Sequence, residues 1–255
     1  MGVKIAMAQM AVEGNAIDQN LLVAEQCIGE AAGNGAAIVV LPECMDLGWT
    51  HPSSLVAATE IPDGRVFRTL SRAAKKHKVF VCSGMTEKEG DRVYNTAVLI
   101  GPDGILLLKH RKINELDIGK PYYATGDRLN VADTSLGRLG IMICADALPE
   151  DRSITTALAR MAPGIILSPC AWAVPPGFDN ALTPYGGLWR EAYIPVARAF
   201  KTSIVAVSNV GAISDGPWKE WDCIGASLAI DADGNEITQL PFGVDASCIR
   251  YINVE

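Results

Sequence analysis

The amino-acid sequence predicts an α/β fold in which a mixed sheet carries helices on its outer faces. Apolar runs typical of strands alternate with amphipathic stretches typical of helices, and several of these runs contain no polar residue. Uninterrupted apolar runs indicate strands that are covered on both faces. Two hairpin turns interrupt the alternation, and hairpins join antiparallel strands. Together these observations favour a mixed sheet over an all-parallel, doubly wound one.

The first part of the chain is expected to alternate between strands and helices. A helix over residues 18–33 places Leu21, Ala24, Ile28 and Ala31 on one apolar stripe and ends near two glycines. The other expected elements are a helix near residues 64–77 and strands at residues 3–7, 36–41 and 79–85. The run at 36–41 has no polar alternation, which predicts a strand buried on both faces.

A hairpin is expected in the middle of the chain. Its strands cover residues 93–100 and 105–109, and the sequence Pro102-Asp103-Gly104 between them is typical of a tight turn. A polar and aromatic segment follows up to residue 127 and is expected to lie as a loop over the ends of the strands. Residues 139–143 then form an apolar run near glycines, which predicts another buried strand.

The C-terminal part continues the pattern of strands and helices. It contains the second hairpin turn, at residues 231–234, and one such turn in each half of the chain hints at an internal duplication. The expected elements are helices at residues 153–161 and 188–201, a Pro- and Gly-rich loop at 174–187, and strands at 165–168, 203–209, 225–230 and near 246–253.

Length and composition predict one domain that covers residues 1–255. The chain is 49% hydrophobic and 20% charged, which is enough apolar material for one large core. Its net charge of −7 is spread without a long run of one sign, so neither nucleic acid nor an anionic membrane is expected as a partner. No stretch approaches the ~20 apolar residues that a membrane helix needs.

The cysteines indicate a reducing compartment. There are seven of them, an odd number, and no C-x-x-C pair occurs, so neither a disulfide framework nor a zinc site is predicted. The N-terminal apolar run is too short for a signal peptide. The expected location is the cytoplasm.

Three polar side chains follow directly after expected buried strands. Glu43 follows the run at 36–41, Lys112 follows the second hairpin strand, and Cys144 follows the run at 139–143. Side chains at three strand ends can converge on one pocket. A thiol at a strand-to-loop corner has the geometry of a nucleophile, and the N–H groups after it can bind an oxyanion. Taken alone, however, Cys144 is more typical of a small buried hydrophobe.

A nucleophilic thiol needs a base, and the base in cysteine hydrolases is most often histidine. His77 lies among lysines at a helix end and is expected to be solvated. His51 and His110 lie nearer the expected site, but neither has an evident orienting carboxylate. A Cys-His dyad remains an alternative, ranked below a carboxylate base beside a lysine, namely Glu43 with Lys112.

The ordered motifs around these residues resemble a known family. LPE at 41–43, HRK at 110–112 and GIMICAD at 140–146 resemble the Glu-Lys-Cys triad of the nitrilase superfamily of carbon-nitrogen hydrolases. The resemblance covers essentially the whole chain, and further segments that carry it are AMAQM at 6–10, VYNTAVLIGPDG at 93–104, SPCAW at 168–172 and VSNVG at 207–211. The amidase- and carbamoylase-like branch is the nearest in pattern.

The resemblance implies a covalent mechanism that needs neither a metal nor an organic cofactor. Lys112 would favour the thiolate of Cys144 and later stabilise an oxyanion, with the N–H of Ala145 as a second donor. Glu43 would accept the thiol proton, pass it to the departing amine, and then activate water to hydrolyse the thioester.

Two departures from the family pattern concern the surroundings of the triad. Ala145 stands where many relatives have an aromatic or polar residue, which implies a roomier pocket or a neighbour that fills the space. Lys120 stands near the place of a second family glutamate. Glu115 is the nearest carboxylate that could replace that glutamate, although it could equally cap a turn or pair with Arg111. Asp146 is assigned to structural support.

The resemblance implies a small amide as substrate, for an amidase, an ω-amidase or an N-carbamoyl amidohydrolase. Trp172, Tyr122 and Tyr123 are expected to form pocket walls. Nitrile hydrolysers of the superfamily typically carry Trp and Glu after the cysteine, whereas this chain has Ala145 and Asp146. Alternatives are a nitrilase acting on a small nitrile, a catalytically poor member that binds a metabolite or partner, and a thiol-dependent acyltransferase.

The fold implied by the resemblance is a four-layer α-β-β-α sandwich. It is expected to form when two such chains pack together, so that a homodimer or larger homo-oligomer results.

Overall fold

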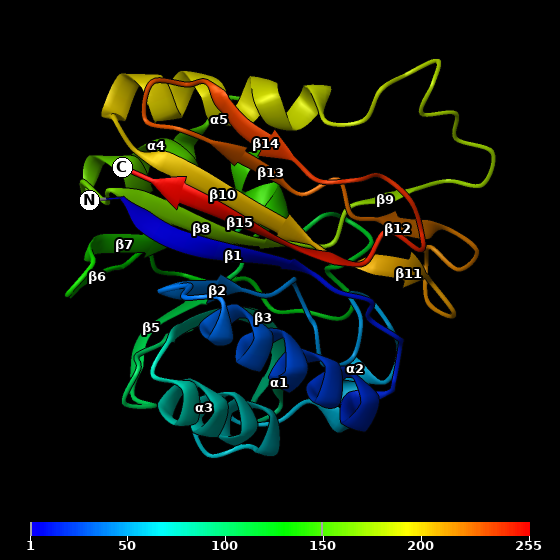
Figure 1. Ribbon diagram of the computed structural model, residues 1–255. Coiled ribbons are helices and arrows are strands. Elements are labelled where there is room, and N and C mark those ends of the chain that lie inside the picture. The colour runs from blue at the N-terminus through cyan, green and yellow to red at the C-terminus, as the bar shows by residue number, and fades with distance from the viewer. Residues whose placement is uncertain (1, 149) are drawn as a thin grey trace.

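The computed structural model describes residues 2–148 and 150–255, which form a four-layer sandwich. Two six-stranded sheets pack face to face, and helices cover the outer face of each (Figure 1). The α-β-β-α architecture is therefore confirmed. Because both sheets belong to one chain, the expectation that the four layers need two chains is wrong. Apart from its last strand, which joins the first sheet, the second half of the sequence builds a sheet of its own.

The first sheet has the strand order β15-β1-β2-β3-β4-β5. Its outer face carries helices α1 (Ile17–Gly33) and α3 (Arg65–His77), with the short α2 (Ser54–Ala57) between them in the chain. The strands are β1 (Val3–Gln9), β2 (Ile38–Val40), β3 (Phe80–Glu89), β4 (Arg92–Ile100), β5 (Leu106–Arg111) and β15 (Cys248–Val254).

The second sheet has the strand order β14-β13-β10-β8-β7-β6 and carries helices α4 (Ser153–Arg160) and α5 (Gly187–Phe200). Its strands are β6 (Val131–Thr134), β7 (Gly137–Ile141), β8 (Ile165–Cys170), β10 (Ser203–Ser208), β13 (Leu228–Ile230) and β14 (Glu236–Gln239). A small third sheet contains β9 (Ala173–Val174), β11 (Val210–Ala212) and β12 (Asp222–Ile224).

The two large sheets share one pairing scheme, as the hint of duplication predicted. From β15 across the first sheet and from β6 across the second, successive pairs run antiparallel, parallel, parallel, antiparallel and antiparallel. The first sheet takes its edge strand, β15, from the C-terminal end of the chain. The corresponding edge strand of the second sheet, β6, directly precedes its neighbour β7 in the sequence. The chain therefore contains two similar halves, and its last strand completes the first.

The cores confirm that the central strands are covered on both faces. In β1, Ile5 and Met7 pack in the core shared by the two sheets, while Ala6 and Ala8 pack in the core under α1 and α3. This alternation follows from the two-residue period of a strand. The predicted stripe of α1 is also buried. No helix in residues 2–148 and 150–255 is long and apolar enough to cross a membrane.

The sequence missed the short elements and some ends. Strands β6, β9, β11 and β12 and helix α2 have two to four residues each, too few to show a hydrophobic period. Strand β3 extends to Glu89 because its hairpin with β4 continues through the pair Glu89 and Arg92. Its last residues are charged, so the apolar pattern ended too early.

Candidate active site

The ends of β2, β5 and β7 meet at one end of the sandwich. Strand β4 pairs antiparallel with both β3 and β5, so β5 runs in the direction of β2 and β3. The backbone N–H of Glu43 donates to the carbonyl of Cys170 at 3.2 Å, which joins the end of β2 to the end of β8 in the other sheet. Glu43, Lys112 and Cys144 line one cavity at this junction, as their placement after strands predicted.

Cys144 lies on a sharp turn directly after β7. Its φ of +42° is in the left-handed region, which costs a non-glycine residue free energy, and it begins the short 3-10 helix η1 (Cys144–Ala147). The residue is buried apart from 8% of its surface. A thiol held in this strained turn at a cavity has the arrangement expected of a nucleophile.

Asp146 joins the cysteine turn to the loop that carries Lys112. Its Oδ1 accepts hydrogen bonds from the backbone N–H groups of Ile113 (3.0 Å) and Asn114 (2.8 Å), and its Oδ2 accepts one from the N–H of Ile143 (2.9 Å). These bonds, together with His110, hold the pKa of this fully buried carboxyl below its ordinary value against the effect of burial. The geometry supports the structural role assigned to Asp146.

His110 has an orienting carboxylate that the sequence did not reveal. Its Nε2 lies 2.7 Å from Asp146 Oδ2, and its Nδ1 lies 3.3 Å from the carbonyl oxygen of Arg128. Both ring nitrogens are therefore engaged away from the thiol. His51 has one ring nitrogen engaged, with Nδ1 at 2.8 Å from Ser53 Oγ, and it does not line the cavity that contains the thiol. The geometry gives no support to a Cys-His dyad.

Lys112 forms the centre of a buried cluster of carboxylates. Its Nζ lies 2.7 Å from Glu43 Oε1 and 3.0 Å from Glu115 Oε2, and all three side chains are almost completely buried. Asn95, from the middle of β4, donates its amide to Glu43 Oε1 at 2.7 Å and more weakly to Glu115 Oε1 at 3.3 Å. One cation and one amide therefore orient two carboxylates.

Glu115 is the second carboxylate that the structure brings to the site. Trp49 donates its indole N–H to Glu115 Oε1 at 3.0 Å, which fixes the side chain against the cavity wall. The alternative partner, Arg111, pairs instead with Glu87 and Glu89. Lys120 is exposed and pairs with Asp117, remote from the cluster.

One oxygen of Glu43 is bound, and the other is available. Oε1 accepts from both Lys112 and Asn95, whereas Oε2 is buried without a hydrogen-bond partner among the described residues. An unpaired buried carboxylate oxygen is costly, and such groups are concentrated at functional sites. Oε2 is thus the atom that can accept a proton.

Burial dominates the pKa of both groups that would exchange this proton. It raises the pKa of the Glu43 carboxyl, and the Lys112 charge offsets only part of the increase. Burial, contact with Cys170 and the charge of Glu43 raise the pKa of the Cys144 thiol well above its usual range, although Lys112 opposes them. Lys112 acts in the expected direction, toward the thiolate, but burial outweighs this single cation.

Lys112 itself remains charged. Burial acts to lower its pKa, but the neighbouring Glu43 and Glu115 overcome burial and hold the pKa well above the ordinary value. The two carboxylates therefore keep a cation beside the thiol.

The cavity has a volume of about 250 Å³ and is walled mainly by apolar and aromatic side chains. Trp172, expected as a wall residue, lines it, and so does Ala145. Tyr122 and Tyr123 do not, so their expected place in the wall is wrong. Tyr123 is buried behind the wall, where its hydroxyl accepts from the N–H of Thr50 at 3.0 Å. The complete lining consists of Glu43, Trp49, Lys112, Leu116, Cys144, Ala145, Leu148, Ala171, Trp172, Ala173, Tyr185, Leu188, Trp189 and Trp218.

Sequence reasoning missed several of these residues. Asn95 lies inside the segment 93–104 that carries the family resemblance, so its position was visible but its contact with two carboxylates was not. Trp49, Trp189 and Trp218 come from separate loops and from α5, and only the fold brings them together. No local pattern links residues so far apart in the chain.

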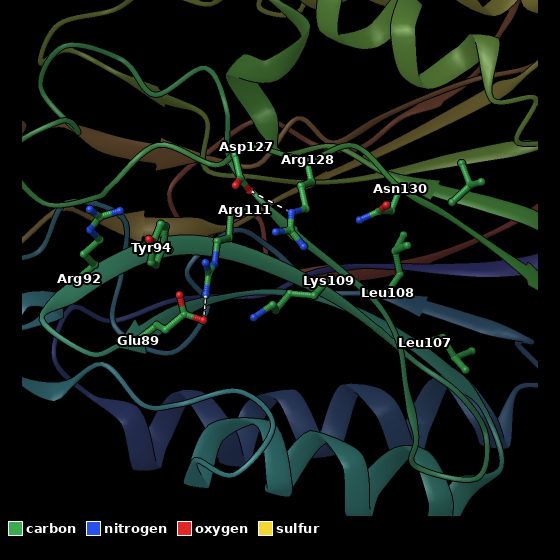
Figure 2. A pocket seen from close by; sticks show the side chains of 11 residues that line it. Glu89, Arg92, Tyr94, Leu107, Leu108, Lys109, Arg111, Asp127, Arg128 and Asn130 are labelled. Atoms are coloured by element: carbon green, nitrogen blue, oxygen red, sulfur yellow. Dashed lines mark ion pairs between the residues drawn. The ribbon is translucent and has the colours of Figure 1, made fainter.

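A larger cavity, of about 640 Å³, lies at the outer edge of β4 and β5 (Figure 2). Its lining has more basic than acidic residues, and both of its carboxylates are paired: Arg111 pairs with Glu89 at 2.7 Å and Arg128 with Asp127 at 3.6 Å. Among the described residues that line it there is no member of the Glu43, Lys112 and Cys144 group. The smaller cavity is the candidate active site because the reactive groups converge there.

Comparison with known proteins agrees with the geometry. The family model for carbon-nitrogen hydrolases matches residues 4–253. An omega-amidase NIT2-A from Xenopus laevis is 36% identical over 264 aligned positions that cover 98% of this chain and 91% of that protein. A nitrilase from Pyrococcus abyssi is 36% identical over 160 residues.

Some relatives match over a part of their length only. This chain spans 61% of the Pyrococcus abyssi nitrilase, 42% of a chloroplastic omega-amidase from Arabidopsis thaliana and 54% of an omega-amidase NIT2 from Danio rerio. Among solved structures, a carbon-nitrogen hydrolase from Helicobacter pylori G27 has a TM-score of 0.86 at 21% identity, covering 99% of this chain and 88% of that one. The chain belongs to the carbon-nitrogen hydrolase family, within the nitrilase superfamily.

Proposed function

We propose that the protein is an amidase that hydrolyses a non-peptide carbon-nitrogen bond of a small amide through a thioester on Cys144. The observation that carries the proposal is the free Oε2 of Glu43 in the cavity that also contains the thiol and Lys112. The omega-amidase relative that aligns over nearly the whole chain supports the same reaction class.

In the first step, Glu43 accepts the thiol proton while the sulfur of Cys144 attacks the carbonyl carbon. The negative charge that develops on the carbonyl oxygen is stabilised by Lys112 and by the backbone N–H of Ala145. The carbon-nitrogen bond then breaks, and Glu43 passes its proton to the departing nitrogen, which leaves as ammonia or an amine. The acyl group remains on sulfur as a thioester.

In the second step, Glu43 takes a proton from water, and the resulting hydroxide attacks the thioester carbonyl. The carbon-sulfur bond breaks, the acid leaves, and Glu43 returns the proton to sulfur. Burial raises the pKa of Glu43 above its ordinary value, which suits a group that holds the proton between the two steps. Glu115 orients Lys112 and substitutes for the second family glutamate.

Nitrile hydrolysis is the second candidate within the same family. The Pyrococcus abyssi relative is named a nitrilase, which favours including nitriles in any test. The same thiol can attack a nitrile carbon, so the triad alone does not separate the two. Ala145 and Asp146 after the nucleophile favour the amide.

A catalytically poor binding protein is the third candidate. The buried, oriented cluster of Glu43, Lys112 and Glu115 opposes it, because burying three charges without a catalytic use is costly. An acyltransferase would form the same thioester but pass the acyl group to an added amine. Product analysis with hydroxylamine present distinguishes transfer from hydrolysis.

The proposal is tested by ammonia release from short aliphatic amides, ω-amides, N-carbamoyl compounds and simple nitriles. We expect release from amides by the unaltered protein and none by the Cys144→Ala variant. Cys248→Ser is the matched control. Cys248 lies in β15, the edge strand of the first sheet opposite β5, so this variant should leave the rate unchanged. Release that survives in Cys144→Ala would contradict the proposal.

We further propose that the protein acts in the cytoplasm as a homodimer or larger homo-oligomer on small molecules, without nucleic acid or membrane partners. The family resemblance supports assembly, and all seven cysteines are free, which suits a reducing compartment. Light scattering that gives the 27.1 kDa mass of a single chain would contradict the oligomer.

A further inference from the structure

We propose that the cavity selects uncharged amides with an apolar acyl group and discriminates against amides whose acyl group ends in a carboxylate. The inference rests on the proposed amidase function and adds the substrate class. It differs from what the names of the omega-amidase relatives suggest, because an ω-amide of a dicarboxylic acid carries an acid at its far end.

Aromatic side chains form much of the cavity wall and offer apolar surface to the acyl group. Trp172 stacks on Trp189, with ring centroids 4.6 Å apart, and Tyr185 lies 5.9 Å from Trp172. Trp49 and Trp218 form a second aromatic pair, edge to face at 5.0 Å. Rings held against one another in this way offer rigid apolar surfaces to a bound acyl chain.

The volume sets the size of the acyl group. At about 250 Å³ the cavity lies near the lower end of the roughly 300–1,000 Å³ that small-molecule pockets span, which suits a small acyl group. A longer chain would extend past Leu188, which is 58% exposed at its margin.

The charges of the lining leave no cation for a substrate carboxylate. Among the described residues that line the cavity, only Glu43 and Lys112 are charged. Lys112 is already bound by Glu43 and Glu115, at 2.7 and 3.0 Å. A second acid placed there would be desolvated without a cation to pair with and would be repelled by the two carboxylates, whereas a neutral chain meets neither penalty.

A neighbouring depression of about 270 Å³ does not supply the missing cation. It shares Leu148 and Leu188 with the cavity, and its charged residues are Glu150, Arg152 and Glu191. The Arg152 guanidinium donates to the Glu191 carbonyl at 3.1 Å, and two acidic residues, Glu150 and Glu191, line the depression with it. The local charge is therefore negative, as is that of the whole chain.

The test compares two amides of equal size that differ in charge alone. Succinamate and 4-oxopentanamide are isosteres in which a carboxylate oxygen is replaced by a methyl group. We expect kcat/KM to favour 4-oxopentanamide by at least about 100-fold. Calorimetry can measure how tightly each amide binds to the Cys144→Ala variant, which cannot turn it over. We expect the same preference in these affinities.

Variants test the cause of the preference. Leu188→Arg places a cation at the margin of the cavity and is expected to raise kcat/KM for succinamate about tenfold. Leu182→Arg is the matched control, because Leu182 is 82% exposed and lies outside the cavity lining. This variant should leave kcat/KM unchanged for both substrates. Arg152→Gln should likewise leave the rate with 4-oxopentanamide unchanged.

The outcomes separate this inference from the function on which it rests. Equal rates, or a preference for succinamate through Cys144, would overturn the inference and leave the amidase function standing. A succinamate preference that Arg152→Gln removes would assign the missing cation to Arg152. Absence of hydrolysis and of binding with every amide would overturn both.

Discussion

Asn95 donates its side-chain amide to Glu43 at 2.7 Å from the middle of β4, so a strand orients the carboxylate of the candidate base. Strands are positioned by ladders on both sides and move less than loops. The same amide reaches Glu115 at 3.3 Å. Asn95 therefore acts as a positioning residue for the site.

The Asn95→Leu variant tests this role. We expect kcat to fall about 10- to 100-fold with little change in KM, because the base loses its orientation but the cavity keeps its walls. The Asn95 hydrogen bond lowers the pKa of Glu43, so its removal should raise that pKa and move the acid limb of the pH profile to higher pH. A lower rate with an unmoved acid limb would indicate a packing role alone.

The two glutamates are expected to respond differently to loss of charge. Glu43→Gln removes the atom that accepts the thiol proton and should lower kcat by about 10³-fold. Glu115→Gln keeps the base and removes one of two carboxylates beside Lys112, so a loss of about tenfold is expected. Steady-state kinetics with one amide substrate compares the two variants. Equal losses would contradict the assignment of the base to Glu43 alone.

Asp146→Asn should destabilise the fold by about 2–4 kcal/mol, because one amide cannot accept all four hydrogen bonds that the carboxylate accepts. Urea unfolding measures the change. Asp133→Asn, which removes an exposed partner of Arg138, is the control and should cost under about 0.5 kcal/mol. Because the pKa of Asp146 is lowered by folding, the difference between Asp146→Asn and the unaltered protein should shrink as pH falls toward acid.

Asp46 gives the opposite pH dependence. Burial raises the pKa of its carboxyl from 3.8 to about 6, although Thr86 donates to it. A raised pKa in the folded state means that stability is highest when the group is protonated and falls as pH rises from about 4 to 6. Over the whole titration, the free energy of unfolding falls by about 3 kcal/mol.

Asp46→Asn removes this titration. Relative to the unaltered protein, the variant should gain about 2.5 kcal/mol in free energy of unfolding between pH 4 and pH 7.5. Urea unfolding at both values checks it. A difference between the two proteins that stays constant with pH would show that Asp46 keeps an ordinary pKa.

The sequence predicted the features that depend on local periodicity. The run at 36–41 has an apolar residue at each position, and Ile38 and Val40 do face one core while Val39 and Leu41 face the other. The stripe of α1 was predicted residue by residue for the same reason. The sequence also predicted that the polar residues after these strands converge, and they do so where the ends of strands from both sheets meet.

Contacts across the fold were beyond a local pattern. His110 and Asp146 are 36 positions apart and Trp49 and Glu115 are 66 apart, so neither pair could be read from spacing. Tyr122 and Tyr123 were assigned to the wall because they lie in a loop near the site, but the loop turns Tyr123 inward, away from the cavity. The direction of a loop side chain depends on packing that the sequence does not display.

The central claim is that the acyl group of the substrate becomes bound to Cys144. The most direct measurement is mass spectrometry of the protein quenched in acid during turnover of an amide, followed by digestion. The account predicts the mass of the acyl group, with loss of the amine, on the peptide that contains Cys144, and no such adduct in Cys144→Ala. Turnover without an adduct on this peptide, or an adduct on another cysteine, would contradict it.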